Sequence, residues 1–119
     1  MIYTSRLVVG GGSQADNLAI GKAISAALIE VVDGIQVEPR FVIGKGGITC
    51  SDLATGGLGI RAARVAGQIL PGVPVWVASA GGRWPGIPYV VFPGNVGDEG
   101  AVARVVQALR ASETRGEPA

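Results

Sequence analysis

The segment Phe41–Asp52, FVIGKGGITCSD, joins an apolar run, a glycine turn and a helix-start signal. Its first three residues are aromatic or β-branched without polar alternation, which is typical of a strand covered on both faces. Thr49 precedes Asp52 by the spacing of a capping box, in which each side chain bonds a backbone amide of the other residue. We therefore expect a short helix over residues 50–55, ended by the two glycines that follow.

The turn contains three glycines, Gly44, Gly46 and Gly47. A residue without Cβ accepts a positive φ and lets a ligand approach the backbone closely. A strand that ends at such a turn, beneath the start of a helix, leaves several backbone N–H groups pointing the same way, which suits an anion such as phosphate. The alternative is an ordinary, well-capped connection between a strand and a helix.

The composition favours one globular domain. The 119 residues are 48% hydrophobic and only 5% aromatic, which predicts an aliphatic core. We expect a single α/β domain over residues 1–112 and a frayed polar tail over residues 113–119. The net charge of +1 provides no field for nucleic acid or a membrane surface. A single cysteine and no histidine argue against a disulfide framework, a zinc site and a triad that needs imidazole. With no signal-peptide pattern at the N-terminus, we expect a cytoplasmic protein and neither nucleic acid nor membrane as a partner.

Helical and strand patterns alternate along the chain. We expect strands over residues 2–9, 63–68, 73–78 and 89–92. We expect helices over residues 15–32, capped by Ser13 and stopped at Gly34, and from Asp98 onward. The first helix should pack on a sheet through a stripe formed by Ile20, Ile24, Ala27, Leu28 and Val31, and the last through Val102, Val105, Val106 and Leu109. Together these elements predict a layered α/β fold, with a mixed or mostly parallel sheet and flanking helices.

A second glycine turn, Pro93-Gly94-Asn95-Val96-Gly97, has the same organisation as the first. It follows an apolar strand and precedes a helix that begins with acidic residues. In open α/β sheets, ligands collect beyond the carboxyl ends of the strands. We therefore expect the two turns to face one crevice.

Three ordered blocks resemble a known family: KGGITCSDLAT (45–55), GQILPGVPVW (67–76) and PGIPYVVFPGNVG (85–97). They are similar to the C-terminal nucleotide-binding domain of the four-carbon acid sugar kinases, some of which carry the label of a Hrp-dependent type III effector. The resemblance covers nearly the whole chain. It implies ATP-dependent phosphorylation, with Mg²⁺ accompanying the nucleotide, of a threonate, erythronate or 3-oxo-tetronate on its terminal hydroxyl. The residues that it places against ATP are Gly46, Gly47, Ile48, Thr49 and Gly94.

The chain also departs from that family. Family members carry a separate N-terminal domain that holds the sugar acid and acts on its hydroxyl, and the nucleotide-binding domain itself opens with a further strand, turn and helix. Neither part is found in these residues, so we expect no catalytic residue here, no kinase activity from the chain alone, and contact with a sugar acid only through the missing domain. Cys50 stands where a serine is more usual.

Several alternatives stay open. Lys45 is either a phosphate partner or a solvated cation, and Asp52 either reaches Mg²⁺ through water or only caps its helix. A non-enzymatic remnant that forms a homo-oligomer or binds a protein partner is the second functional reading, because a lost strand and helix would expose an apolar edge. A nicotinamide-binding fold fits less well, since neither turn has the Gly-x-Gly-x-x-Gly spacing.

Overall fold

The computed structural model of the chain describes residues 1–2, 12–79 and 81–114. The strand expected over residues 2–9 lies almost entirely outside the described residues. The elements follow one another as α1 (Gln14–Asp33), β1 (Val42–Lys45), α2 (Gly47–Asp52), the π-helical η1 (Leu53–Gly57), β2 (Ala63–Leu70), β3 (Val73–Ala78), β4 (Pro88–Phe92) and α3 (Ala101–Thr114).

The four described strands form one mixed sheet in the order β1-β4-β3-β2. β1 and β4 run parallel, with Val42 opposite Tyr89 and Lys45 opposite Phe92. The β2–β3 and β3–β4 pairs are antiparallel. The α/β class with a mixed sheet is confirmed, and a mostly parallel sheet is not found among the described strands. Because β1 and β4 end side by side, the two glycine turns leave the sheet at the same edge.

β2 lies at one end of this order, and its pairing with β3 is irregular. The register shifts between Val65 and Gly67 and again between Gln68 and Leu70. Gly67 has φ +147°, a conformation that residues with a side chain rarely adopt. The chain then reverses at Pro71-Gly72 into β3.

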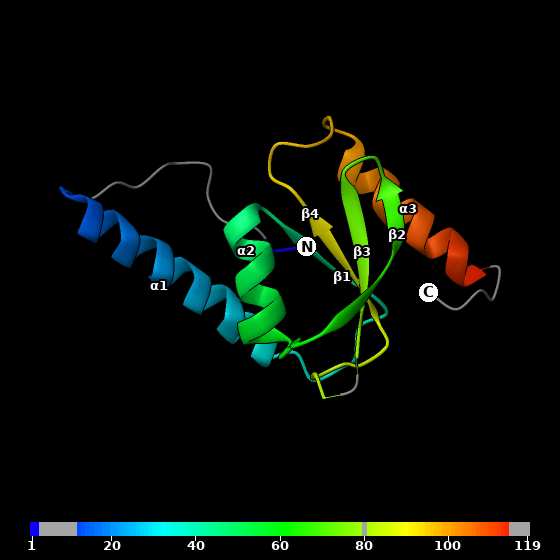
Figure 1. The fold of residues 1–119 in the computed structure, drawn as a ribbon, viewed down its shortest axis with the longest axis horizontal. Helices are drawn as coiled ribbons and strands as arrows, with labels where there is room; N and C mark the ends of the chain where they lie inside the picture. The colour runs from blue at the N-terminus through cyan, green and yellow to red at the C-terminus, as the bar shows by residue number, and fades with distance from the viewer. Residues whose placement is uncertain (3–11, 80, 115–119) are drawn as a thin grey trace.

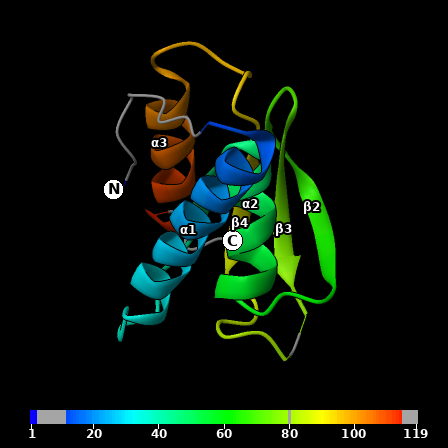
Figure 2. The ribbon, with the colours of Figure 1, turned by 90° about the vertical axis from the view of Figure 1, so that its left-hand side faces the viewer.

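Helices cover both faces of the sheet (Figure 1). Figure 2 shows α1 and α2 together on one face and α3 on the other. On the α3 side the buried core consists of Val73, Val90, Phe92, Ala101, Val105 and Leu109. On the side of α2 and η1 it consists of Ala54, Leu58, Ile60, Ala78 and Tyr89. Strand β1 contributes to both sides, as the unbroken apolar pattern predicts, because Ile43 packs on the first cluster and Val42 on the second.

α3 begins three residues later than the sequence predicts. The Asp98 carboxylate accepts a hydrogen bond from the Gly100 amide at 3.0 Å, and the Asp98 carbonyl accepts one from the Ala101 amide at 3.2 Å. Asp98 therefore precedes the helix and bonds its first amides. The buried stripe is largely as predicted, since Val105 and Leu109 are buried and Val102 packs at the edge of the cluster.

α1 lies within one residue of the predicted bounds at each end but does not make the predicted contacts. Ser13 caps its start, accepting from the Asp16 amide at 3.2 Å. No residue of α1 is buried, and Ile24 and Val31 of the expected core stripe are each 43% exposed. α1 packs on η1 near its C-terminal end, where the Ile29 side chain lies against Gly56, and its other end extends away from the sheet (Figure 1). The expectation that this stripe covers the sheet is therefore wrong.

The C-terminal end of α1 is held by a distant arginine. The Arg83 guanidinium donates to the carbonyl oxygens of Val32 and Ile35, and to that of Asp33 at 3.1 Å. The same guanidinium lies 4.3 Å from the centre of the Trp84 ring. Gly34 does follow the helix, but its φ is −75°, so the helix does not end in a left-handed glycine.

Candidate functional site

The first glycine turn leads directly into α2. Gly46 is the N-cap with φ +104°, and the Cys50 amide bonds the Gly46 carbonyl at 2.8 Å. The helix therefore begins at Gly47, three residues earlier than predicted, and no side chain caps it. The expected capping box of Thr49 and Asp52 is wrong, because the left-handed glycine turns the backbone into the helix before Thr49 is reached. The predicted end at the double glycine is confirmed, since η1 continues α2 to Gly57.

The two glycine turns touch one another. A Cβ built on Gly94 would lie 3.6 Å from the Gly46 Cα. The Gly46 amide donates to the Phe92 carbonyl at 2.9 Å, which ties the first turn to the end of β4. The Thr49 hydroxyl lies 3.8 Å from the Cβ position of Gly46. With Gly47 and Ile48 in the first turn of α2, the five predicted site residues share one edge of the sheet.

This edge presents backbone donors. The bond from the Cys50 amide is the first that closes within α2, so the amides of Gly47, Ile48 and Thr49 precede the hydrogen-bonded part of the helix. Such amides carry the partial positive charge of a helix N-terminus. The arrangement can bind an anionic oxygen through backbone groups, with no side chain in the way at the glycines.

Lys45 spans both turns from the end of β1. Its Nζ lies 3.5 Å from the carbonyl oxygen of Pro93 and 3.5 Å from that of Gly94. The same ammonium lies 4.5 Å from the centre of the Phe92 ring. A positive charge is thereby placed at the junction of the two turns.

Buried hydrogen bonds hold α2 against the strands beneath it, at the edge of the sheet where the two turns meet. The Cys50 thiol donates to the Gly44 carbonyl at 2.6 Å, and the Tyr89 hydroxyl donates to the Cys50 carbonyl at 2.6 Å. Burial raises the pKa of the Cys50 thiol, although the Phe92 carbonyl and the Lys45 charge act in the opposite direction. Burial, and to a lesser extent the neighbouring Cys50, also raise the pKa of Tyr89. Both groups are therefore protonated at neutral pH and act as hydrogen-bond donors.

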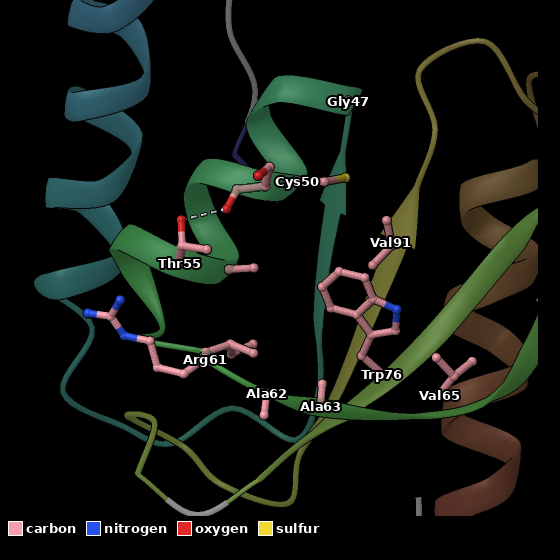
Figure 3. A pocket seen from close by; sticks show the side chains of 12 residues that line it. Gly47, Cys50, Thr55, Arg61, Ala62, Ala63, Val65, Trp76 and Val91 are labelled. Atoms are coloured by element: carbon pink, nitrogen blue, oxygen red, sulfur yellow. Dashed lines mark hydrogen bonds between the residues drawn. The ribbon is translucent and has the colours of Figure 1, made fainter.

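A hollow of about 440 Å³ opens between the inner side of α2 and η1 and the face of β2 and β3 (Figure 3). Figure 3 shows Trp76 and Val91 across from the helix, with Arg61 at the lower end. Gly47 borders this hollow, whereas Gly46, Thr49 and Gly94 do not. The volume falls within the ~300–1,000 Å³ of small-molecule sites.

A pattern of small residues in the sequence indicates this hollow, although it does not enter the predictions above. The lining residues of α2 and the start of η1 are small, namely Gly47, Cys50, Ser51 and Ala54. Small residues at helical spacing leave room between a helix and the sheet beneath it. Thr55 continues the same face, and its hydroxyl donates back to the Ser51 carbonyl at 2.9 Å.

Among the described residues, no group of three or more acidic or cysteine side chains could hold a metal ion. The same residues include no helix that is long and apolar enough to cross a membrane.

Comparison with known protein families supports the assignment that the two turns suggest. Residues 1–102 match the family model described as a nucleotide-binding C-terminal domain. The chain belongs to this family. No curated protein and no solved structure matches the chain significantly. The match to the nucleotide-binding C-terminal domain includes both glycine turns, α2 and the whole sheet.

Proposed function

We propose that the chain is the ATP-binding part of a kinase that phosphorylates a four-carbon sugar acid on its terminal hydroxyl. The phosphates lie against the amides of Gly47, Ile48 and Thr49, next to Gly46 and Gly94. The base and ribose occupy the hollow that starts at Gly47. The observation that carries the proposal is the contact between the two turns, 3.6 Å from the Cβ position of Gly94 to the Gly46 Cα, at the end of two parallel strands.

The residues suit a nucleotide better than a free metal ion. Backbone amides, a lysine and glycines without side chains match the oxygens of a polyphosphate. Mg²⁺ enters with the nucleotide, and the phosphates supply much of its coordination, as is usual for Mg²⁺ at nucleotide sites. When bound, it would supply charge neutralisation for phosphoryl transfer.

The substrate part of the proposal rests on the resemblance to the four-carbon acid sugar kinases. In that family a separate domain holds the threonate, erythronate or 3-oxo-tetronate. We therefore assign nucleotide binding to these residues and no catalytic residue, and we expect the chain alone to transfer no phosphate to a sugar acid.

Isothermal titration calorimetry with Mg-ATP tests nucleotide binding. The wild-type chain should bind at low-millimolar nucleotide or below. Gly94→Val should weaken binding by about tenfold or more, because its side chain would project into the junction of the turns, where the phosphate sits. Gly94 has no positive φ, and an added Cβ would make only an ordinary contact, so this variant should fold.

Gly12→Val is the matched control. Gly12 is exposed, lies before α1 and has no positive φ, so the same change there should leave ATP affinity as in the wild type. A wild-type chain that gives no ATP-dependent heat at millimolar nucleotide would overturn the proposed function.

A second candidate, a module that self-associates, is favoured by one observation. Ile24 and Val31 of α1 are each 43% exposed although they lie on one apolar stripe of the helix. We propose that this stripe pairs with a second copy of the chain. Self-association and nucleotide binding use different surfaces, so the two proposals are compatible.

A further inference from the structure

The sequence alone does not decide whether Lys45 is a phosphate partner or a solvated cation. Its side chain is exposed, and the ammonium folds back onto the second glycine turn. It rests on the carbonyl oxygens of Pro93 and Gly94 and above the face of Phe92. These contacts place one positive charge where the two glycine turns meet.

The contacts of this ammonium are weak. Both N–O distances are 3.5 Å, beyond the ~2.7–3.2 Å of a well-formed hydrogen bond. An ammonium has three donor hydrogens, and within the described residues no carboxylate forms an ion pair with Lys45. Asp98, in the segment that follows the second turn, is bound to Arg104 at 3.0 Å. Lys45 is thus a positioned cation that can leave its neutral partners for a charged one at little cost.

We infer that Lys45 is the phosphate-binding cation of the proposed nucleotide site and joins the two turns around the polyphosphate. This inference rests on the proposed function. Without nucleotide the ammonium bridges the turn at Gly94; with nucleotide it moves to a phosphate oxygen that the α2 amides also bind. A charge-assisted contact of this kind is stronger than two long bonds to carbonyl oxygens.

If Lys45 binds phosphate, its contribution to the affinity for a ligand should be large when the ligand carries phosphate groups and small when it does not. Lys45→Met should weaken binding of Mg-ATP and of inorganic tripolyphosphate by about tenfold or more, the loss typical of one hydrogen bond to a charged group. Binding of adenosine should change less than about twofold, because adenosine carries no phosphate. Lys45→Arg should keep most of the affinity for tripolyphosphate, since it keeps the charge.

Calorimetric titrations with ATP, tripolyphosphate and adenosine measure these affinities. Lys22→Met is the matched control: it removes the same charge from an exposed position on α1 and should change none of them. Thermal melting of each variant checks that the fold is kept, which is expected because both lysines are exposed.

The outcomes separate the two proposals. If the wild-type chain binds ATP and Lys45→Met binds it equally well, the role of Lys45 is overturned and the proposed function stands. If Lys45→Met and Lys22→Met weaken ATP binding to the same extent, the effect is general electrostatics and the role of Lys45 is again overturned. If the wild-type chain binds neither ATP nor tripolyphosphate, the proposed function itself fails.

Discussion

At the scale of single residues, Gly44 is the tightest point beneath the candidate site. A Cβ there would collide with the Tyr89 hydroxyl and would lie 3.1 Å from the ring carbon that carries it and 3.3 Å from the Cα of Cys50. Gly44 does not have a positive φ, so its backbone conformation does not demand a glycine. A glycine is required here because there is no room for a Cβ atom. The sequence analysis places Gly44 in the glycine turn, whereas it lies within β1. The steric reason for a glycine could not be predicted, because it involves a tyrosine on another strand.

Gly44→Ala should destabilise the chain by ~1–3 kcal/mol through overpacking. Gly47→Ala is the control, because a Cβ on Gly47 meets no atom within 4 Å, and it should change stability by less than about 0.5 kcal/mol. Urea unfolding followed by circular dichroism gives both values. Tyr89→Phe should recover part of the loss in the Gly44→Ala background, since it removes the colliding oxygen. Equal stabilities of Gly44→Ala and Gly47→Ala would contradict this account.

At the scale of elements, the start of α1 is capped by a residue close by in the sequence, whereas its end is capped by a distant one. The sequence predicts the cap at Ser13, because the amide that bonds its hydroxyl belongs to Asp16, only three residues away. The last turn is instead capped by Arg83, some 50 positions away, and no local pattern reveals such a partner. The same reasoning applies to α2, whose start depends on the φ of Gly46 and not on the side chains that we expected to cap it.

Arg83→Ala should fray the end of α1 and cost about 1–3 kcal/mol, because the last carbonyls lose charge-assisted donors. Hydrogen exchange should be faster at the amides of residues 30–34 than in the wild type. Arg83→Lys should recover little, since a single ammonium cannot reproduce the forked contacts. Arg64→Ala, an exposed arginine on β2, is the control and should leave that exchange unchanged. Unaltered protection in Arg83→Ala would show that the helix end is held by other contacts.

At the scale of the whole molecule, the strands and helices were largely predictable and their assembly was only partly so. Apolar runs and glycine turns locate β1, β3, β4 and both long helices, and the strand predicted over residues 63–68 corresponds to β2. The contact between the two turns follows from the parallel pairing of β1 and β4. We expected the two turns to face one crevice, but the spacing of residues does not reveal which strands pair. The amphipathic pattern of α1 did not predict its contacts. An apolar stripe indicates that one face of a helix is suited to burial, but it does not say which surface covers that face.

That stripe leads to the prediction on self-association. Ile20, Ile24, Ala27 and Val31 follow one another at spacings of four, three and four residues, the pattern of a helix-pair seam, and none is charged. In an antiparallel pair of α1 helices, Ile24 would face Ala27 and Ile20 would face Val31, so large side chains meet smaller ones. The pairing is isologous, as in most dimers.

Multi-angle light scattering over a concentration series should show the mass of the wild-type chain rising toward that of a dimer. Ile24→Glu should hold the mass at the monomer value, because a charge would enter the apolar seam. Leu18→Glu, also exposed on α1 but outside the stripe, should leave the association as in the wild type. A wild-type chain that stays monomeric at the highest concentrations would refute the pairing.

The uneven pairing of β2 with β3 has a further consequence for how copies meet. An incoming strand needs a straight row of amides and carbonyls at regular intervals, and the two slips around Gly67 interrupt that row. The flank of the sheet formed by β2 is therefore a poor template for fibre-like stacking. In concentrated solution, strand-to-strand contact between copies should therefore not form along β2.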